Sequence, residues 1–251
     1  FMIVGIPGLI LALAAFFLKE PKRIEEQVNF DKGVERKNIF LHLKEHKKTL
    51  IPMFGGLIFM ALIFYSFSFW APTMMIRAFN VSLSEVGLIL GLITIVSSII
   101  GTILAGSAVD YLRNKNYSDA PVRAAMIAVM LALPPIVMLS FVSSEIGAWI
   151  CIALYLLFIS SFAPLGLLAI SGVSTGSVKG QAAAIHAFLM MAFGLSLGPQ
   201  LTAFFTDFIF ADPNLLINSI SLSGLIVLPI SALLFKMSLR RYRESSQKIL
   251  A

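Results

Sequence analysis

Long uncharged stretches are the feature of this sequence that most restricts its fold. Six of them contain no Asp, Glu, Lys or Arg except Arg123, and they cover residues 50–73, 86–109, 122–142, 147–171, 182–206 and 215–235. An opening apolar run at 2–18 is a seventh. About 20 apolar residues in a helix cross the hydrocarbon core of a bilayer. The sequence therefore predicts an all-α integral membrane protein with seven transmembrane helices.

The basic residues lie almost entirely on one side of the predicted spans. Of the 19 Lys and Arg residues, all but Arg77 fall on that side. Because Lys and Arg resist translocation, we expect that side to be cytoplasmic, with the carboxyl end in the cytoplasm and the amino-terminal end outside. This predicts a multi-pass protein of the cell (inner or plasma) membrane. The charge is spread over short loops, which argues against nucleic acid as a partner.

The predicted spans are arranged as one plus six. A charged segment separates the opening span from the other six, and residues 34–48 within it have the pattern of a short amphipathic helix at the membrane surface. Because residue 1 already lies in a span and no basic residues precede it, we expect the chain to begin inside a longer protein. The expected divisions are a helix at 1–18, a cytoplasmic loop at 19–48, a six-helix unit at 49–237 and a cytoplasmic tail at 238–251.

Small residues form stripes at steps of three or four in two of the spans. Such faces let another helix backbone approach closely. Static helix packing and a sliding or gating contact are both consistent with the pattern. The residues are Gly87, Gly91 and Gly101 in the 86–109 stretch, and Gly194, Gly198 and Pro199 in the 182–206 stretch.

Polar side chains inside the spans are candidates for a cavity lining. Tyr65 and Ser68 share one helical face, and a hydroxyl in hydrocarbon requires a partner or a watery cavity. His186, in line with Met190, is either a functional group or a neutral histidine bonded to a neighbouring helix. Together with Tyr155 these residues predict a mostly apolar, aromatic lining, which suits an amphiphile better than an ion or a sugar.

One motif suggests a metal but lacks the surroundings for it. His42-Leu43-Lys44-Glu45-His46 fits the H-x-x-E-H pattern of a zinc peptidase. A catalytic zinc needs a third protein ligand, but no acidic residue follows until Glu85, and lysines surround the motif. We therefore expect no metal site and no cofactor, and the chain shows no catalytic constellation of an enzyme.

The connection after the 86–109 stretch carries the most specific motif. Gly106 is followed by Asp110 and then by Arg113 and Lys115, which resembles the loop signature of the major facilitator superfamily. Tyr111 and Arg113 depart from it, since a basic residue and a glycine are usual at those positions. Other segments resemble the Spinster-like branch of that family: Gly5-Ile6-Pro7-Gly8-Leu9, Phe69-Trp70-Ala71-Pro72-Thr73, Ser84-Glu85-Val86-Gly87 and Gly198-Pro199.

This resemblance implies that the chain holds the last helix of the amino-terminal half, the central loop and the six-helix carboxy-terminal half of a twelve-helix transporter. It implies alternating-access transport of an amphipathic organic solute, with a lysolipid as one option. Gly106, Asp110 and Arg113 would then form a conformational switch against the opposite half.

The partners that the resemblance implies are the amino-terminal half of the same protein, the lipid bilayer and a small-molecule substrate. The coupling ion, with a proton among the options, is left open. The alternatives are a seven-span receptor, a drug or metabolite efflux pump of another branch of the superfamily, and a membrane-embedded enzyme.

Overall fold

A computed structural model describes residues 39–174 and 176–250, and every element in this part of the chain is helical. Within it, six segments are long and apolar enough to cross a membrane: Lys47–Phe79, Leu83–Asn114, Ala120–Phe141, Glu145–Ser171, Val178–Phe210 and Pro213–Gln247. They correspond to the six later spans expected from the sequence. The expected opening span at 1–18 and the loop as far as residue 38 lie outside the described residues.

The six spans belong to one compact unit, Lys37–Ala251. A short helix, α2 (Ile39–Glu45), precedes the first two spans, α3 (Lys47–Phe79) and α4 (Leu83–Asn114). The third span joins α5 (Ala120–Met138) to η1 (Leu139–Phe141), and the fourth joins α6 (Glu145–Ile159) to α7 (Phe162–Ser171). The fifth runs through α8 (Gly176–Leu189), η2 (Met190–Leu195), α9 (Ser196–Phe204) and η3 (Phe205–Phe210), and the sixth through η4 (Pro213–Leu215) and α10 (Leu216–Leu250).

Local capping residues determine where the spans turn. Asn80 ends α3 in a left-handed conformation with a φ of 56°, which asparagine adopts more readily than most residues. Ser82 and Glu85 then begin α4 with a capping box, in which each side chain bonds the other residue's backbone N–H. Ser144 begins α6 in a similar way by accepting a hydrogen bond from the Gly147 N–H. Short polar turns therefore separate long apolar helices.

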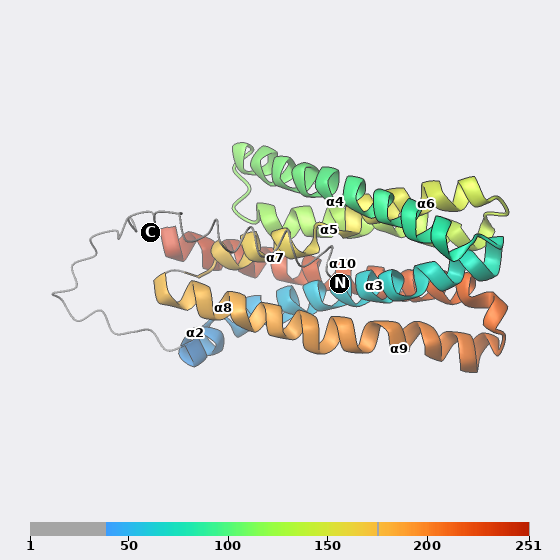
Figure 1. Ribbon diagram of the computed structural model, residues 1–251. Helices are drawn as coiled ribbons and strands as arrows, with labels where there is room; N and C mark the ends of the chain where they lie inside the picture. Colours follow the sequence, from blue (N-terminus) through green and yellow to red (C-terminus); the bar gives the residue numbers. More distant parts are fainter. Residues whose placement is uncertain (1–38, 175, 251) are drawn as a thin grey trace, which may run out of the picture. The chain divides into compact units, whose positions relative to one another are not determined.

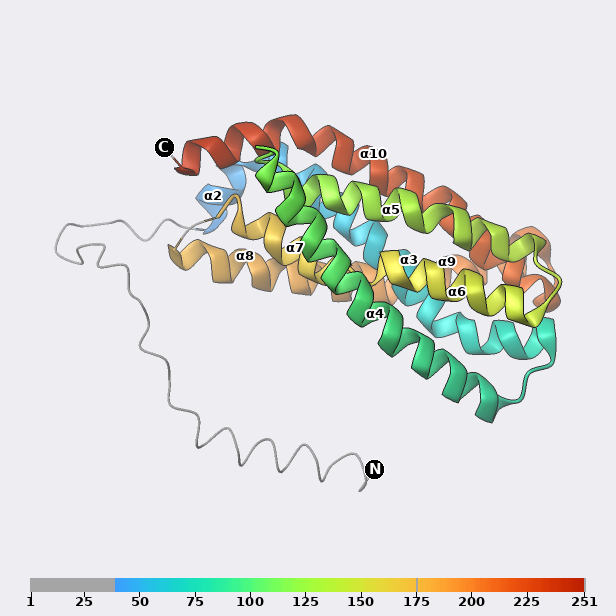
Figure 2. The same cartoon turned by 90° about the horizontal axis from the view of Figure 1, so that it is seen from above.

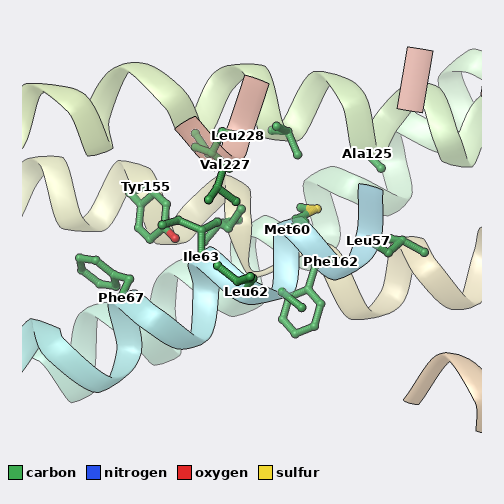
Figure 3. Packing of buried hydrophobic residues seen from close by; sticks show 14 of the residues in the cluster. Leu57, Met60, Leu62, Ile63, Phe67, Ala125, Tyr155, Phe162, Val227 and Leu228 are labelled. Atoms are coloured by element: carbon green, nitrogen blue, oxygen red, sulfur yellow. The ribbon is translucent and has the colours of Figure 1, made fainter. Parts of the chain in front are cut away.

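The core of the unit surrounds α3. This helix contacts α4, α6, α7, η2, α9 and α10, and the side chains of Met53, Leu57, Met60 and Ile63 are almost completely buried. Figure 3 shows Met60, Leu62 and Ile63 of α3 among side chains from α5, α6, α7 and α10. α3 is therefore the central helix of the described bundle, and the other spans are placed by how they pack against it.

Hydroxyl groups join α3 to α10 along one seam. Ser231 donates a hydrogen bond to the Gly56 carbonyl (2.8 Å), and the Ser245 and Thr49 hydroxyls lie 2.9 Å apart. Ser238, midway between these serines, donates to the Thr49 carbonyl (3.4 Å). The three serines are seven residues apart, a period that keeps one helix face toward a neighbour over several turns. The spacing therefore holds α10 against α3 along the end of the bundle where α10 finishes.

Candidate functional site

The small-residue stripes of the sequence divide into packed and open parts. At Gly101, an added Cβ would overlap the Leu157 carbonyl oxygen of α6, and at Gly198 it would overlap the Leu62 carbonyl oxygen of α3. Gly194 lies against Ala61, where an added Cβ would come within 2.9 Å of the alanine Cβ. Pro199 accepts a hydrogen bond from the Trp70 indole N–H (2.9 Å). These glycines therefore act as contacts between helices inside the unit.

The other glycines of α4 face no neighbour in the described part of the chain. At Gly87, Gly91 and Gly106, no described atom lies within 4 Å of an added Cβ. Large apolar side chains beside them, including Leu88 and Leu92, are more than half exposed. Figures 1 and 2 show α4 at one edge of the group of helices. We call the surface formed by Gly87, Leu88, Gly91 and Leu92 the open face of α4.

An aromatic cluster lies beside α7. The Tyr65 ring of α3 is 5.9 Å from the Phe162 ring of α7, and Phe64 completes the cluster at 5.4 Å from Tyr65 and 5.0 Å from Phe162. One turn further along α7, Gly166 faces the imidazole of His186, which would come within 2.5 Å of a Cβ at that position. The structure therefore places Tyr65 and His186 against successive turns of α7. The positions of the two residues in the sequence do not indicate this proximity.

His186 itself is almost entirely buried. Its ring stacks on Phe54 of α3 at 6.1 Å with an angle of 17°, and only 4% of the residue is exposed. Its Nδ1 has no hydrogen-bond partner in the described part of the chain. The His186 ring is thus held by flat packing on Phe54 of α3 and against Gly166 of α7.

The remaining candidates differ in their exposure. Ser68 is exposed, and its hydroxyl donates to the Phe64 carbonyl of its own helix (2.8 Å). Met190 is buried at the start of η2, a π-helical segment that packs against α3. Single π-helical turns inside α-helices occur frequently at functional sites, because they disturb the regular hydrogen-bond ladder. Ser68 therefore lies at a surface, whereas Met190 lies beneath one.

Tyr155 lies apart from the other candidates. Its side chain is fully buried, and its ring packs on Phe67 at a distance of 4.8 Å (Figure 3). Phe67 and Tyr65 are two residues apart on α3 and so point about 200° away from one another around the helix. Tyr155 therefore occupies the core on a different side of α3 from Tyr65. Lining a cavity would require α6 to be arranged differently from what is seen here.

The loop motif and the ion pairs lie at what we call the cationic end of the bundle, where α4 and α10 finish and α3, α5 and α8 begin (left in Figure 1). Asp110 and Arg113 are exposed in the last turns of α4, and no ion pair to either occurs within residues 39–174 and 176–250. The loop motif therefore presents its carboxylate and its guanidinium outward.

A buried carboxylate that sequence reasoning missed lies close by in the chain. Asp119, which is completely buried, bonds Arg123 of α5 (3.0 Å) and Arg243 of α10 (3.1 Å). Arg123 also lies over the Tyr117 ring at 4.4 Å. The signal was present in the sequence, because Arg123 is the one charged residue within the predicted spans and Asp119 precedes it by one helical turn. This ion cluster ties the start of α5 to the end of α10.

The metal motif gains no support from the described residues. No group of three or more His, Cys, Asp or Glu side chains that could hold a metal ion occurs among them. The His46 ring nitrogen Nδ1 instead lies 3.4 Å from the Ser245 hydroxyl.

A multi-span helical bundle with an ionic loop motif at one end and an unpacked helix face defines the class of protein: a multi-pass membrane protein. The sequence model of the Major Facilitator Superfamily matches residues 1–199. The chain therefore belongs to this family of transporters.

Two solved structures have a similar fold. Both are crystal structures of a bacterial homolog of the human lysosomal transporter Spinster in an inward-facing conformation. The unoccupied form matches with a TM-score of 0.62 at 18% identity, over 100% of this chain and 59% of that one. The occupied form matches with a TM-score of 0.58 at 16% identity, over 99% and 57%. The chain thus spans less than two thirds of these proteins. No curated protein sequence matches it.

Proposed function

We propose that this chain is the carboxy-terminal half of a secondary active transporter, which moves an amphipathic organic solute across the membrane by alternating access. The family match and the Spinster-like fold support the transporter class. The observation that carries the proposal is the open face of α4, a transmembrane surface of small and apolar residues that no described helix covers. The amino-terminal half would pack there and rock against it.

Glycine spacing supports a helix partner for this face. Gly87 and Gly91 are four residues apart and therefore lie on one side of α4, which lets a second helix backbone approach closely. A purely lipid-facing helix has no need of such a groove. We therefore assign Gly87 and Gly91 to contact with the other half, and Gly101, Gly194 and Gly198 to packing within this one.

The substrate surface that we propose is built on α3 and its neighbours. Tyr65 and the exposed Ser68 are three residues apart and so lie on the same side of α3, whereas His186 and Met190 are buried. Aromatic rings and few hydrogen-bonding groups suit a molecule with an acyl chain and a polar end, such as a lysolipid. Tyr155 would contribute from the core, by fixing Phe67.

Asp110 and Arg113 would act as the switch. Both are exposed at the cationic end and form no ion pair within the described residues, so they are accessible to helix ends of the opposite half. Only Arg77 of the described cations lies at the other end of the bundle, which supports placing the cationic end in the cytoplasm.

Transport by the full protein in reconstituted vesicles tests this function. With a fluorescent lysophospholipid as the probe, we expect Tyr65→Ala to reduce the initial rate about tenfold at an unchanged folded yield, since the variant loses an aromatic contact with substrate. Tyr155→Ala should instead reduce the yield of folded protein, because it leaves a void in the core.

Phe141→Ala is the matched control, since Phe141 is 80% exposed and lies at the end of η1, away from the aromatic cluster. It should transport like the wild type. An unchanged rate in Tyr65→Ala would remove Tyr65 from the substrate surface. The absence of lysophospholipid transport in the wild type would exclude that substrate class.

A further inference from the structure

A groove at the cationic end, separate from the proposed substrate surface, lies between the start of α3 and the last turns of α10. Its volume is about 520 Å³. The apolar part of the lining comes from Ile51 and Pro52 of α3 and from Leu234 and Met237 of α10, and the rest from Lys47, Lys48 and Arg241. Ile51 is 68% exposed and Met237 is 58% exposed, so the groove opens outward from the bundle.

Among the residues that the structure describes, the three cations of the groove form no ion pair. The nearest carboxylates in the chain are Glu45 and Glu244, and neither forms an ion pair with them. Glu244 pairs with the neighbouring Arg240 (3.2 Å), which does not line the groove. Three positive charges around one concave surface repel each other, and an anion between them would relieve this repulsion.

The apolar floor distinguishes a lipid from a free anion. Ile51 and Leu234 belong to the membrane-spanning segments Lys47–Phe79 and Pro213–Gln247, so an acyl chain of the bilayer can reach the floor. A soluble phosphate would gain nothing from this surface. A phospholipid would place its phosphate among the cations and lay an acyl chain along the apolar floor, and cationic pockets between transmembrane helices bind lipid headgroups in this manner.

A neighbouring groove shows that this combination is specific. The cavity between α5 and α10 is similar in size, about 470 Å³, and is lined by apolar side chains such as Met130 and Leu233. It contains a single cation, Lys236. Of these two grooves beside α10, only the α3–α10 groove concentrates charge.

We propose that the groove formed by Lys47, Lys48, Ile51, Pro52, Leu234, Met237 and Arg241 binds one anionic phospholipid of the surrounding leaflet. The bound lipid bridges α3 to α10 and so stabilises the seam formed by Ser231, Ser238 and Ser245. This site is independent of the proposed transport function, because none of its lining residues belongs to α4 and because it requires no substrate.

Native mass spectrometry of the full protein in detergent micelles tests the proposal. The probes are dioleoylphosphatidylglycerol, which is anionic, and dioleoylphosphatidylcholine, which is zwitterionic. We expect the wild type to retain one phosphatidylglycerol in preference to phosphatidylcholine. The triple variant Lys47→Gln, Lys48→Gln, Arg241→Gln should lower the affinity for phosphatidylglycerol about tenfold or more, because each cation near a membrane surface contributes to anionic lipid binding.

The chain offers a control that removes the same net charge. Lys44→Gln, Lys179→Gln, Arg240→Gln also neutralises three exposed cations at this end, but none of them lines the groove. It should keep wild-type affinity within about twofold. All six side chains are exposed, so both triple variants should fold, and gel filtration checks this.

Three outcomes would overturn the proposal. The first is a wild type that binds phosphatidylglycerol no better than phosphatidylcholine. The second is an equal loss of affinity in both triple variants, which would show diffuse electrostatics in place of a site. The third is displacement of the lipid by glycerol 3-phosphate at the same concentration, which would identify a site for soluble phosphates.

Discussion

α3 and α4 are consecutive spans of nearly equal length and similar apolarity, yet the fold uses them differently. α3 has 33 residues and a mean hydropathy of 2.1 over its most apolar stretch, and α4 has 32 residues and a value of 2.5. In that stretch 61% of the α3 residues are buried, compared with 11% of the α4 residues. The more hydrophobic helix is therefore the less buried one.

The difference shows that hydropathy in this protein reports the membrane and not the core. Lipid tails and protein interiors are both apolar, so an apolar residue gains little by exchanging one for the other. Helix position is decided by close packing and by interhelical hydrogen bonds. α3 packs against helices on several sides, whereas α4 buries a narrow stripe of Ser97, Gly101, Ala105 and Val109, spaced four residues apart.

Two glycines of α4 test this division most strongly. We expect Gly101→Leu to destabilise the full protein by more than about 3 kcal/mol, because the new side chain would overlap the Leu157 carbonyl of α6. Gly91→Leu, ten residues earlier on the same helix, should fold normally but transport poorly, because it fills the face assigned to the other half. Fluorescence-detected gel filtration measures folding, and vesicle uptake measures transport. Equal folded yields would mean that α4 packs on α6 less closely than the structure indicates.

Leucines on the two helices give the next largest effect. Leu57 of α3 is 1% exposed and Leu92 of α4 is 57% exposed. Leu57→Ala should cost about 2–3 kcal/mol through the cavity that it leaves, and Leu92→Ala less than about 0.5 kcal/mol. Thermal unfolding in detergent compares the two variants. A loss from Leu92→Ala as large as the loss from Leu57→Ala would contradict this division between the two helices.

Hydroxyl groups provide the smallest and finest test. The Thr202 hydroxyl of α9 bridges Ser66 of α3 (2.7 Å) and Ser223 of α10 (2.9 Å), whereas the Thr94 hydroxyl of α4 donates to the Leu90 carbonyl of its own helix. Since an interhelical hydrogen bond in a membrane is worth about 0.6 kcal/mol, Thr202→Val should cost about 1 kcal/mol and Thr94→Val almost nothing. Unfolding midpoints that fall equally would contradict the bridging role.

Much of the span pattern, but little of the candidate site, could be predicted from the sequence. The six later spans were predicted because each is a local property of about 20 residues. The ion cluster of Asp119 was missed, because its second partner, Arg243, is 124 residues away. A signal for the α3–α10 seam was present in the seven-residue spacing of Ser231, Ser238 and Ser245, but serine spacing alone does not identify the helix that receives the bonds.

The cavity candidates show the same limit at the level of single residues. Tyr65 and Tyr155 are chemically equivalent in the sequence, but α3 turns one toward Phe162 and packs the other behind Phe67. Gly91 and Gly101 belong to one stripe, yet only Gly101 meets another backbone in the described bundle. Residue type indicated which groups were candidates, and packing decided which of them share a surface.

By itself, the sequence determined that the chain lies in a membrane and where its six later helices run, because a backbone in lipid must satisfy its hydrogen bonds within each segment. Only the tertiary structure decided that α3 is central and α4 peripheral, that Asp119 is buried between two arginines, and that three cations surround one groove. These features depend on shape and on pairs of residues far apart in the chain. α3 and α4 are both hydrophobic, so hydrophobicity carries no information about shape or about which distant residues pair.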